Sequence, residues 1–250
     1  MSYTGVAFGR ALMLTETDNG IIFHQTSKED FDKIWYSYFD FETDYSRIKA
    51  ELSRDKILAG AIGYGSGIRI LRQDLWECVV SFIISASNNI PRIKKIIKSL
   101  CENFGEEILY MGKSYYAFPT PERLAGLSLA DISVIKAGFR DKYILAAAEY
   151  FVNTDTEKIS ALPTIEAKAE LKRISGIGEK VANCVLLFGM ARRESFPVDV
   201  WVKRIMEYCY FDKPESVEGI ADFAKTQFGE LGGYAQQYLF FWAREEKIGI

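Results

Sequence analysis

The stretch Leu171-Lys-Arg-Ile-Ser-Gly-Ile-Gly-Glu-Lys180 decides the fold of this chain, and an aspartate follows nineteen residues later in Phe196-Pro-Val-Asp199. Apolar residues recur at helical spacing on both sides of the two glycines, which predicts helices over 164–174 and 178–190. The Gly-Ile-Gly run between them has the small side chains that a tight connection of two helices requires. The sequence therefore predicts a helix–hairpin–helix at about 164–190.

The two glycines of the hairpin, Gly176 and Gly178, permit unusual backbone dihedrals and a close approach of a second backbone. The N–H groups exposed at the start of the next helix, together with the helix dipole, favour an anion such as phosphate. A packing turn without a ligand is the alternative interpretation of the same residues. The hairpin therefore indicates a phosphate-binding turn.

An amine and a carboxylate stand next to this turn. Lys180 lies in the first turn of the second helix, where a positive charge is electrostatically disfavoured, and this favours the neutral, nucleophilic amine. A solvated or phosphate-contacting lysine is the alternative. Asp199 stands directly before an apolar helix, which is the position of an N-cap, and a cap would also fix the carboxylate for chemistry. The combination points to an enzyme that acts on the sugar of DNA.

The composition bounds the class of protein. With 250 residues, 48% of them hydrophobic and 26% charged, the chain has the make-up of an ordinary globular protein. The formal net charge is −3, so a nucleic-acid partner must be bound by positive charge that is focused locally. No apolar run approaches the ~20 residues of a membrane span, and the N-terminus lacks a signal-peptide pattern, so we expect no membrane and a cytoplasmic location.

The cysteines and the single histidine narrow the chemistry. The four cysteines Cys78, Cys101, Cys184 and Cys209 lie far apart without a Cys-x-x-Cys pair. We therefore expect no zinc site and no iron–sulfur cluster. His24 stands in a strand-like stretch and is interpreted as structural. Acid–base work must then fall to carboxylates or to an amine.

The order of secondary-structure signals predicts the fold class. Residues 1–26 read as β structure with a turn at Asp18-Asn19-Gly20, and a short β excursion is expected within 109–118. Helices are expected over 28–39, 44–54, 74–87, 90–104, 121–136, 141–152, 164–174, 178–190, 199–210, 217–228 and 233–246. We therefore expect a mainly α fold with a small N-terminal antiparallel β element, an α+β class. Residues 1–26 would be the remnant of a β domain, and 27–250 the helical body.

The residues quoted above resemble the helix–hairpin–helix glycosylase superfamily, with its Gly/Pro-rich loop and aspartate, and more narrowly the 8-oxoguanine DNA glycosylase/AP lyase family. The segments that match in order are Gly67-Ile-Arg-Ile-Leu-Arg-Gln-Asp74, Ser81-Phe-Ile83, Asn88-Asn-Ile90, Tyr116-Ala-Phe-Pro119, Gly138-Phe-Arg140, Gly176-Ile-Gly-Glu-Lys-Val-Ala-Asn-Cys184, Pro197-Val-Asp199 and Ala235-Gln236 through Phe240. The resemblance covers most of residues 1–246. Superfamily members that only remove a base commonly lack the lysine at position 180, whereas those that also cut the strand have it.

The resemblance implies a bifunctional enzyme of base excision repair that removes 8-oxoguanine. Lys180 would attack C1′ of the deoxyribose, Asp199 would steady the positive charge on the sugar, and the Schiff base would allow β-elimination. No metal and no organic cofactor are implied, with a monovalent cation held by the hairpin's carbonyls as an option. The implied partner is double-stranded DNA with an oxidised purine, bound by a monomer.

The resemblance also implies the residues that bind the substrate. Gln236 would hydrogen-bond the purine edge, and Phe240 and Cys184 would sandwich its ring, with an ordinary core role as the alternative for both. The residues implied to contact DNA are Ser87, Asn88, Asn89, Arg92, Phe139, Arg140, Gly176 and Gly178. A run with four cations and no anion, over 92–98, supports such a contact. Arg92 and Arg140 together would favour a cytosine opposite the lesion, because an arginine can donate to the acceptor edge of cytosine.

Two departures from the family pattern bear on specificity. Ser87 stands where the family has the first of several asparagines that plug the duplex. The family also has an upstream β segment with a Gly-Gln-x-Phe-Arg-Trp-like motif, whose glycine carbonyl reads the proton on N7 of 8-oxoguanine. Met1 aligns just after that motif. We therefore expect either a missed upstream start or a protein that discriminates oxidised from normal guanine differently or poorly.

Two alternative functions remain on the same scaffold. The first is a broader purine or alkylated-base glycosylase, against which Lys180 argues. The second is a catalytically weak helix–hairpin–helix DNA-binding protein. The joint presence of Lys180, Asp199 and Gln236 disfavours this second alternative.

Overall fold

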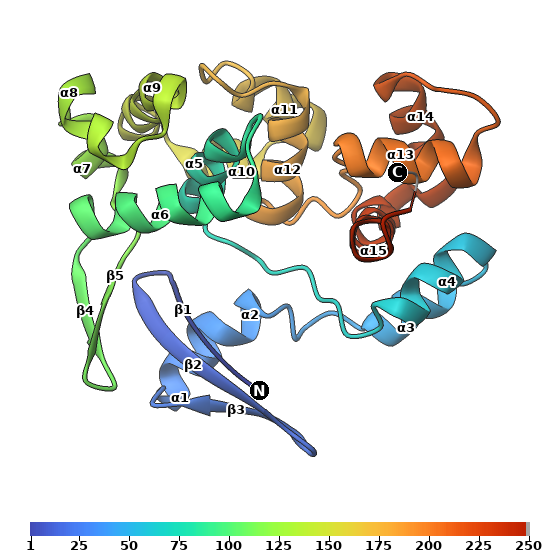
Figure 1. Ribbon diagram of the computed structural model, residues 1–250, viewed down its shortest axis with the longest axis horizontal. Helices are drawn as coiled ribbons and strands as arrows, with labels where there is room; N and C mark the ends of the chain where they lie inside the picture. Colours follow the sequence, from blue (N-terminus) through green and yellow to red (C-terminus); the bar gives the residue numbers. More distant parts are fainter. Residues whose placement is uncertain (249–250) are drawn as a thin grey trace. The chain divides into compact units, whose positions relative to one another are not determined.

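The computed structural model describes residues 1–248, and the chain divides into two compact units. Unit 1 comprises Met1–Ser37 and Gln73–Ile177, and unit 2 comprises Tyr38–Arg72 and Gly178–Ile250. Helices predominate, and the strands of the described residues form two small antiparallel sheets (Figure 1). The expected mainly α fold with an N-terminal β element is confirmed.

The N-terminal sheet of unit 1 has the strand order β1-β2-β3. The strands are β1 (Ser2–Ala7), β2 (Arg10–Thr17) and β3 (Gly20–His24). Phe8 and Gly9 form the first turn with φ angles of 50° and 67°, a pair of left-handed residues that matches the twist of a two-residue hairpin. Phe8 was expected in a strand and lies in this turn instead. The second turn falls at the predicted Asp18-Asn19-Gly20.

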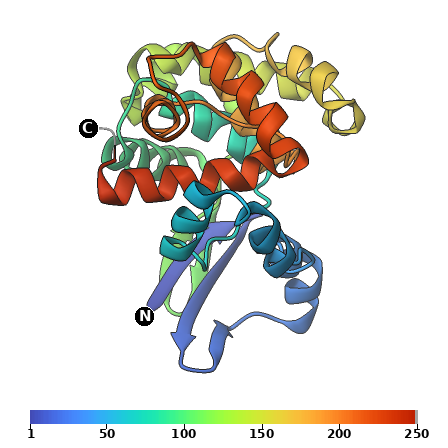
Figure 2. The same cartoon turned by 90° about the vertical axis from the view of Figure 1, so that its right-hand side faces the viewer.

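Three short helical segments follow the sheet, namely α1 (Lys28–Asp30), the π-helical turn η1 (Phe31–Trp35) and α2 (Tyr36–Tyr38). The π turn interrupts the single helix that was expected over 28–39. The Phe31 ring packs edge-on against the Phe23 ring of β3 with centroids 5.1 Å apart, so these helical turns lie against the sheet (Figure 2).

The rest of unit 1 is mostly helical. Its elements are α5 (Leu75–Ser85), α6 (Ile90–Phe104), β4 (Glu107–Tyr110), β5 (Lys113–Tyr116), α7 (Pro121–Ala125), α8 (Leu129–Ile132), the 3-10 turns η2 (Ser133–Ile135) and η3 (Gly138–Arg140), α9 (Asp141–Asn153), α10 (Thr156–Ala161) and α11 (Thr164–Leu171). The Tyr110 hydroxyl donates to the carbonyl of His24 at 2.5 Å and accepts from the N–H of Met13 at 3.1 Å. The β4–β5 hairpin is thereby fastened to the N-terminal sheet.

Unit 2 is helical throughout its described residues. Its elements are α3 (Tyr45–Leu52), α4 (Lys56–Tyr64), α12 (Glu179–Gly189), α13 (Val200–Tyr210), α14 (Val217–Phe228), the 3-10 turn η4 (Gly229–Leu231) and α15 (Gly232–Glu246). Helix α15 packs against both α4 and α13 (Figure 1). Leu58, Ile205 and Leu239 are fully buried in the core that these three helices share. The core of unit 2 therefore forms around α15, which also carries predicted site residues.

Further helices differ from those expected, and α10 and α4 were both absent from the prediction. Helix α4 contains Gly60 and Gly63, which disfavour a helix locally, yet its buried face packs on α15. The helix expected over 121–136 is broken after α7, where a Ser128–Asp131 capping box starts α8. Within residues 1–248, every helix falls short of the length and apolarity that a membrane span requires.

Candidate active site

Helix α12 begins at the hairpin and carries two of the predicted site residues. Gly178 precedes it in extended backbone, with φ −93° and ψ −174°. Lys180 and Cys184 are four residues apart, so they lie on the same face of the helix. Lys180 is half-buried, whereas Cys184 is only 4% exposed. The first turn of α12 thus presents an amine above a buried thiol.

Asp199 caps helix α13 with one of its two carboxylate oxygens. Its Oδ1 accepts hydrogen bonds from the N–H groups of Trp201 and Val202, both at 2.9 Å. Both cap bonds use Oδ1, so Oδ2 takes no part in the cap. The predicted N-cap is confirmed, and it holds the carboxylate in one orientation while keeping its second oxygen outside the cap.

The thiol of Cys184 shows that these side chains lie together in unit 2. Burial raises the pKa of Cys184 to about 11, the negative charge of Asp199 adds to this rise, and the nearby Lys180 opposes it by charge and by a side-chain hydrogen bond. The thiol is therefore within electrostatic reach of both the amine and the carboxylate. Because the pKa is raised, the thiol stays protonated at neutral pH and presents a polarizable, uncharged surface.

Helix α15 adds a further set of predicted residues to unit 2. Gln236 is 4% exposed, and its Oε1 accepts a hydrogen bond of 2.6 Å from the amide of Gln237. Phe240 lies one turn later on the same face, and the Arg244 guanidinium stands 5.5 Å from its ring centroid. An amide with a fixed orientation and an aromatic ring are thus presented by consecutive turns of one helix.

In unit 1, Gly176 occupies a backbone state that only glycine adopts without strain. Its φ is +92°, and a Cβ built on it would lie 2.6 Å from Cγ of Tyr143. Gly178, in unit 2, has an ordinary extended backbone, and a Cβ built on it would meet nothing within 4 Å. The first glycine is therefore required by the fold, and the second leaves open space in front of the start of α12.

The predicted DNA-contacting loop of unit 1 runs from Ser87 to Arg92. Ser87 is exposed and adopts a left-handed φ of 50°. The Asn88 amide donates to the carbonyl of Ile84 at 3.0 Å, and Asn89 caps α6 by accepting from the Arg92 N–H at 3.1 Å. The two asparagines therefore shape the loop, and the side chains of Ser87 and Arg92 are exposed.

Arg140 in unit 1 is buried, with 2% of its surface exposed. Its guanidinium donates to the carbonyls of Ala86, at 3.0 Å, of Ala137, at 3.1 Å, and of Ser87, at 3.0 Å. Burial lowers the pKa of Arg140, and the positive charge of Arg92 lowers it further. In this structure Arg140 therefore braces the loop before α6, and its predicted contact with the opposite base stays a prediction.

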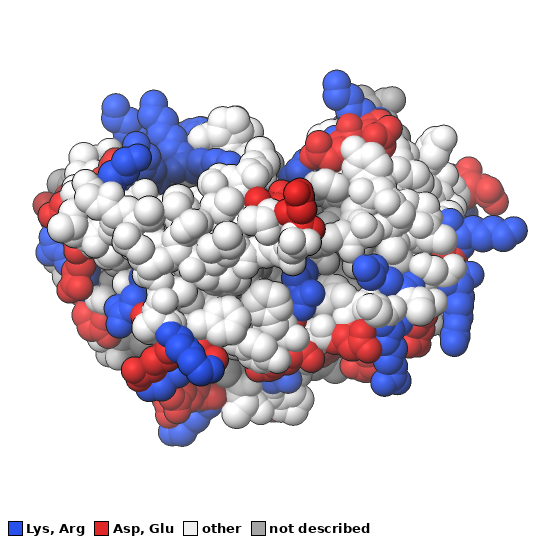
Figure 3. Space-filling model, turned by 90° about the horizontal axis from the view of Figure 1, so that it is seen from below, with Lys and Arg blue, Asp and Glu red and all other residues white. Residues whose placement is uncertain are grey.

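Exposed groups surround this loop. The Phe139 ring is 57% exposed and lies against the Arg140 guanidinium at 4.3 Å. Helix α6 presents Lys94, Lys95 and Lys98 to solvent in addition to Arg92. Figure 3 shows Lys and Arg side chains gathered in one patch at its upper left, whereas charges of both signs mix toward its lower edge and right-hand side. Positive charge is thus focused locally, as the net charge of −3 requires for a nucleic-acid partner.

The structure brings the predicted residues into two groups. In unit 2, Lys180, Cys184 and Asp199 converge, and α15 carries two more. In unit 1, the loop before α6 and η3 are joined through Arg140. Among residues 1–248, no set of three or more His, Cys, Asp or Glu side chains is arranged to hold a metal ion. Sequence reasoning missed a buried aspartate in unit 2, Asp40, whose only signal was an acid between two aromatics, Phe39 and Phe41.

Two family models match the chain. The model described as "8-oxoguanine DNA glycosylase, N-terminal domain" matches residues 1–79. The model described as "HhH-GPD superfamily base excision DNA repair protein" matches residues 80–227 and includes the hairpin, Lys180 and Asp199. The two matches follow each other without a gap.

Relatives and solved structures agree with these models. A "Probable N-glycosylase/DNA lyase" of Methanothermobacter thermautotrophicus is 30% identical over 245 residues, covering 90% of this chain and 77% of that protein. The "N-glycosylase/DNA lyase" of Saccharomyces cerevisiae is 38% identical over 158 residues, covering 58% of this chain and 42% of that protein. The crystal structure of Clostridium acetobutylicum 8-oxoguanine glycosylase/lyase, in complex with double-stranded DNA containing cytosine opposite to 8-oxoG, has a TM-score of 0.95 and 42% identity and covers 99% of this chain and 86% of that chain.

Proposed function

We propose, from the premise that this chain belongs to the 8-oxoguanine DNA glycosylase family, that Lys180 is the nucleophile and Asp199 the electrostatic partner of its reaction. The protein is a bifunctional N-glycosylase/DNA lyase of base excision repair, and DNA is its partner. In our proposal a monomer acts on a duplex that contains 8-oxoguanine. The observation that carries the assignment is the placement of Lys180 in the first turn of α12, one turn before the buried Cys184 thiol, which also lies near the capping carboxylate of Asp199.

The proposed chemistry follows from an amine beside a fixed carboxylate. The damaged nucleotide must first leave the helical stack, because its glycosidic bond is unreachable inside the duplex. The neutral amine of Lys180 then bonds to C1′, and the bond to the purine breaks with its electron pair leaving on the base. Asp199 stabilises the positive charge that develops on the sugar, and its cap geometry keeps it oriented for that purpose. Opening of the sugar ring yields a Schiff base.

The lyase step uses the same nitrogen. The Schiff base acidifies the proton on C2′, and its removal expels the 3′ phosphate oxygen from C3′ by β-elimination, which cuts the strand. Lys180 is thus proposed to serve both steps, and no metal or organic cofactor takes part in the proposal. A half-buried position suits this role, because the amine needs little desolvation when the sugar arrives.

The proposed surface for the base is formed in unit 2. Gln236 offers an amide whose orientation is held by its bond to Gln237, which suits a hydrogen bond to the purine edge. The Phe240 ring supplies an aromatic face, and the protonated Cys184 thiol supplies a polarizable one. The ring of the base would stack between these two faces, and the Gln236 amide would hydrogen-bond the edge of the base.

The proposed contacts to the DNA backbone lie on unit 1 and at the hairpin. Arg92 and the lysines of α6 supply positive charge, and Gly178 leaves space for a phosphate at the start of α12. Phe139 is proposed to contact the duplex near the opposite base because its ring is large and exposed. These contacts would position the duplex, whereas Gln236 would hydrogen-bond the edge of the extruded purine.

Borohydride trapping tests the role of Lys180. We expect the wild type to form a covalent adduct with a duplex containing 8-oxoguanine opposite cytosine, because reduction fixes the Schiff base. Lys180→Gln should form none, since its side chain has no amine. Lys225→Gln, which changes an exposed lysine of α14 in the same unit, is the matched control and should trap like the wild type. Undiminished trapping by Lys180→Gln would remove this lysine from its proposed role.

A further inference from the structure

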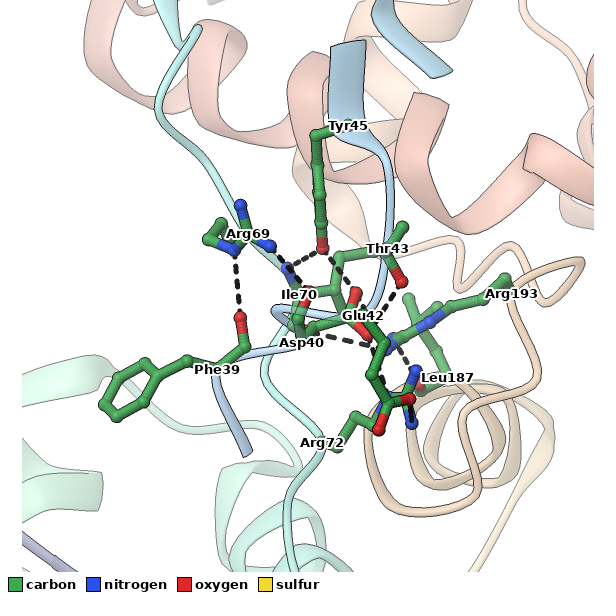
Figure 4. A network of polar contacts seen from close by, with 10 residues as sticks. All are labelled: Phe39, Asp40, Glu42, Thr43, Tyr45, Arg69, Ile70, Arg72, Leu187 and Arg193. Carbon is green, nitrogen blue, oxygen red and sulfur yellow. Dashed lines mark hydrogen bonds and ion pairs between the residues drawn. The ribbon is translucent and has the colours of Figure 1, made fainter. Parts of the chain in front are cut away.

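The most deeply buried charged side chain of unit 2 is Asp40, which is 0% exposed. Its Oδ1 accepts from the Thr43 hydroxyl at 2.9 Å and from Arg72 Nε at 2.8 Å. Its Oδ2 accepts from the Tyr45 hydroxyl at 2.8 Å and pairs with Arg193 Nη2 at 3.5 Å. Figure 4 shows Asp40 at the centre of these side chains. We call Asp40 and these four partners the junction. Each partner matters, because an unpaired charge at a buried position is energetically costly.

Arg193 connects this junction to helix α12. Its side chain is 14% exposed, and its guanidinium donates to the carbonyl of Leu187, in α12, at 3.2 Å. It also donates to the carbonyl of Ile70 at 3.3 Å (Figure 4). One planar, directional group therefore joins the segment around Asp40, the segment before Arg72 and the end of the helix whose first turn carries Lys180.

Helix α15 contacts the backbone of residues 193–195, the stretch of chain that begins with Arg193. The N–H of Gly233 donates to the carbonyl of Arg193 at 2.6 Å. A Cβ on Gly233 would lie 2.3 Å from Leu187 Cδ1 and 2.7 Å from the Arg193 carbonyl oxygen, and a Cβ on Gly232 would lie 2.9 Å from the Glu194 carbonyl oxygen. The two glycines thus allow the backbone of α15 to pack directly on residues 193–195.

The stretch held in this way leads to the proposed catalytic carboxylate. Five residues separate Arg193 from Asp199, and the last four of them, 195–198, are all buried. On the other side, Gln236 follows Gly233 by three residues in α15. We infer that Asp40 and Arg193 are positioning residues, which hold the side chains of Asp199 and Gln236 at fixed places relative to the Lys180 amine. The inference rests on the proposed function, because it assumes the roles given to those three residues.

The chemistry of the junction supports positioning over a contribution to stability. A buried ion pair commonly adds little net stability compared with apolar residues of the same volume. The guanidinium fork instead requires its acceptors at defined places and angles, which an apolar contact does not. Reaction rates are sensitive to such placement, since a shift of about 1 Å at a catalytic group can reduce the rate by roughly 10²-fold.

The test compares Arg193→Met, which keeps the apolar stem, with Arg193→Lys, which keeps a charge for Asp40 but cannot donate to Leu187 and Ile70 together. Each folded variant is assayed at saturating enzyme for the single-turnover rate of 8-oxoguanine excision and for its Kd on a duplex with a tetrahydrofuran site. We expect Arg193→Met to lower the rate by about tenfold or more. Its Kd should stay within about threefold of the wild type, a change below 1 kcal/mol. Arg193→Lys should recover part of the rate.

A second substrate separates the two positioned residues. Borohydride trapping on a duplex with a preformed abasic site needs Asp199 but not Gln236. If Arg193→Met lowers both the excision rate and the rate of trapping on the abasic duplex, Asp199 is the residue that has been displaced. If it lowers the excision rate alone, Gln236 is the displaced residue. Either result supports the inference. Arg10→Met, which breaks the exposed Arg10–Asp30 pair in unit 1, is the matched control and should leave both rates unchanged.

The outcomes distinguish the inference from the proposed function. Wild-type rates in folded Arg193→Met would overturn the inference and leave the proposed function standing. The same holds if its loss of activity matches the unfolded fraction measured by circular dichroism at the assay temperature, because that pattern indicates stability alone. Absence of trapping by the wild type would overturn both. If Arg193→Met does not fold, Arg193→Lys decides the test. A reduced excision rate with a wild-type Kd in Arg193→Lys supports the inference, and a wild-type excision rate in Arg193→Lys overturns it.

Discussion

The two glycines of the hairpin are expected to respond differently to the same substitution, because their surroundings differ. Gly176 has a φ of +92°, and its Cβ would lie 2.6 Å from Cγ and 2.8 Å from Cβ of Tyr143. Gly178 has a φ of −93°, and its Cβ would enter open space. Alanine at position 176 should therefore damage the fold, whereas alanine at position 178 should affect only the approach of a ligand.

The magnitudes follow from these local geometries. For Gly176→Ala, left-handed strain costs about 1–2 kcal/mol and the forced contact with Tyr143 about 1–3 kcal/mol, so the free energy of unfolding should fall by about 2–5 kcal/mol. For Gly178→Ala, a poorer N-cap costs a few tenths of a kcal/mol, which the reduced freedom of the unfolded chain offsets, so that free energy should change by less than about 0.5 kcal/mol. Its methyl group would obstruct the phosphate and weaken DNA binding about tenfold, equivalent to about 1.4 kcal/mol.

Urea unfolding followed by tryptophan fluorescence measures the first quantity, and titration with a duplex that contains a tetrahydrofuran site measures the second. Both variants are carried through both assays, so each serves as the control of the other. An unfolding midpoint of Gly176→Ala equal to that of the wild type would refute the steric reasoning. Normal DNA affinity of Gly178→Ala would refute the proposed phosphate contact.

Two other perturbations have signs that the structure determines. Burial raises the pKa of Glu77 from 4.5 to about 7, with Asp74 adding to the rise, so the folded protein binds this proton more tightly than the unfolded chain. The contribution of this proton to the free energy of unfolding is complete below pH 4.5 and is lost as the pH rises through 7, by up to about 3 kcal/mol. Glu77→Gln should therefore flatten the dependence of that free energy on pH, measured by urea titration at several pH values. An unchanged pH dependence would contradict the assignment. Replacing Lys94 and Lys95 with glutamine should weaken binding to damaged and undamaged duplexes alike and reduce the slope of log K against log salt by about 1–2, and a constant slope would exclude both lysines as phosphate contacts.

Local chemistry made part of the fold predictable. The cap at Asp199, the helix start after Gly178 and the turn before Gly20 each depend on a few neighbouring residues, so the sequence alone located them. Helix α4 was missed for the opposite reason. Its glycines disfavour a helix locally, and only its packing on α15, far along the chain, stabilises it. The prediction of one helix over 121–136 was wrong because the first helix ends at Ala125 and a capping box at Ser128 starts a second helix.

The sequence by itself located the residues of the proposed chemistry, since the hairpin, the amine and the carboxylate are specified by residue type and short spacing. Only the tertiary structure decided which side chains surround them. The pairing of Asp40 with Arg193 joins residues 153 positions apart, and the burial of Arg140 depends on carbonyls more than fifty residues away. Such partners are set by long-range packing of apolar helices, which brings polar groups together without leaving a periodic or local signal in the sequence.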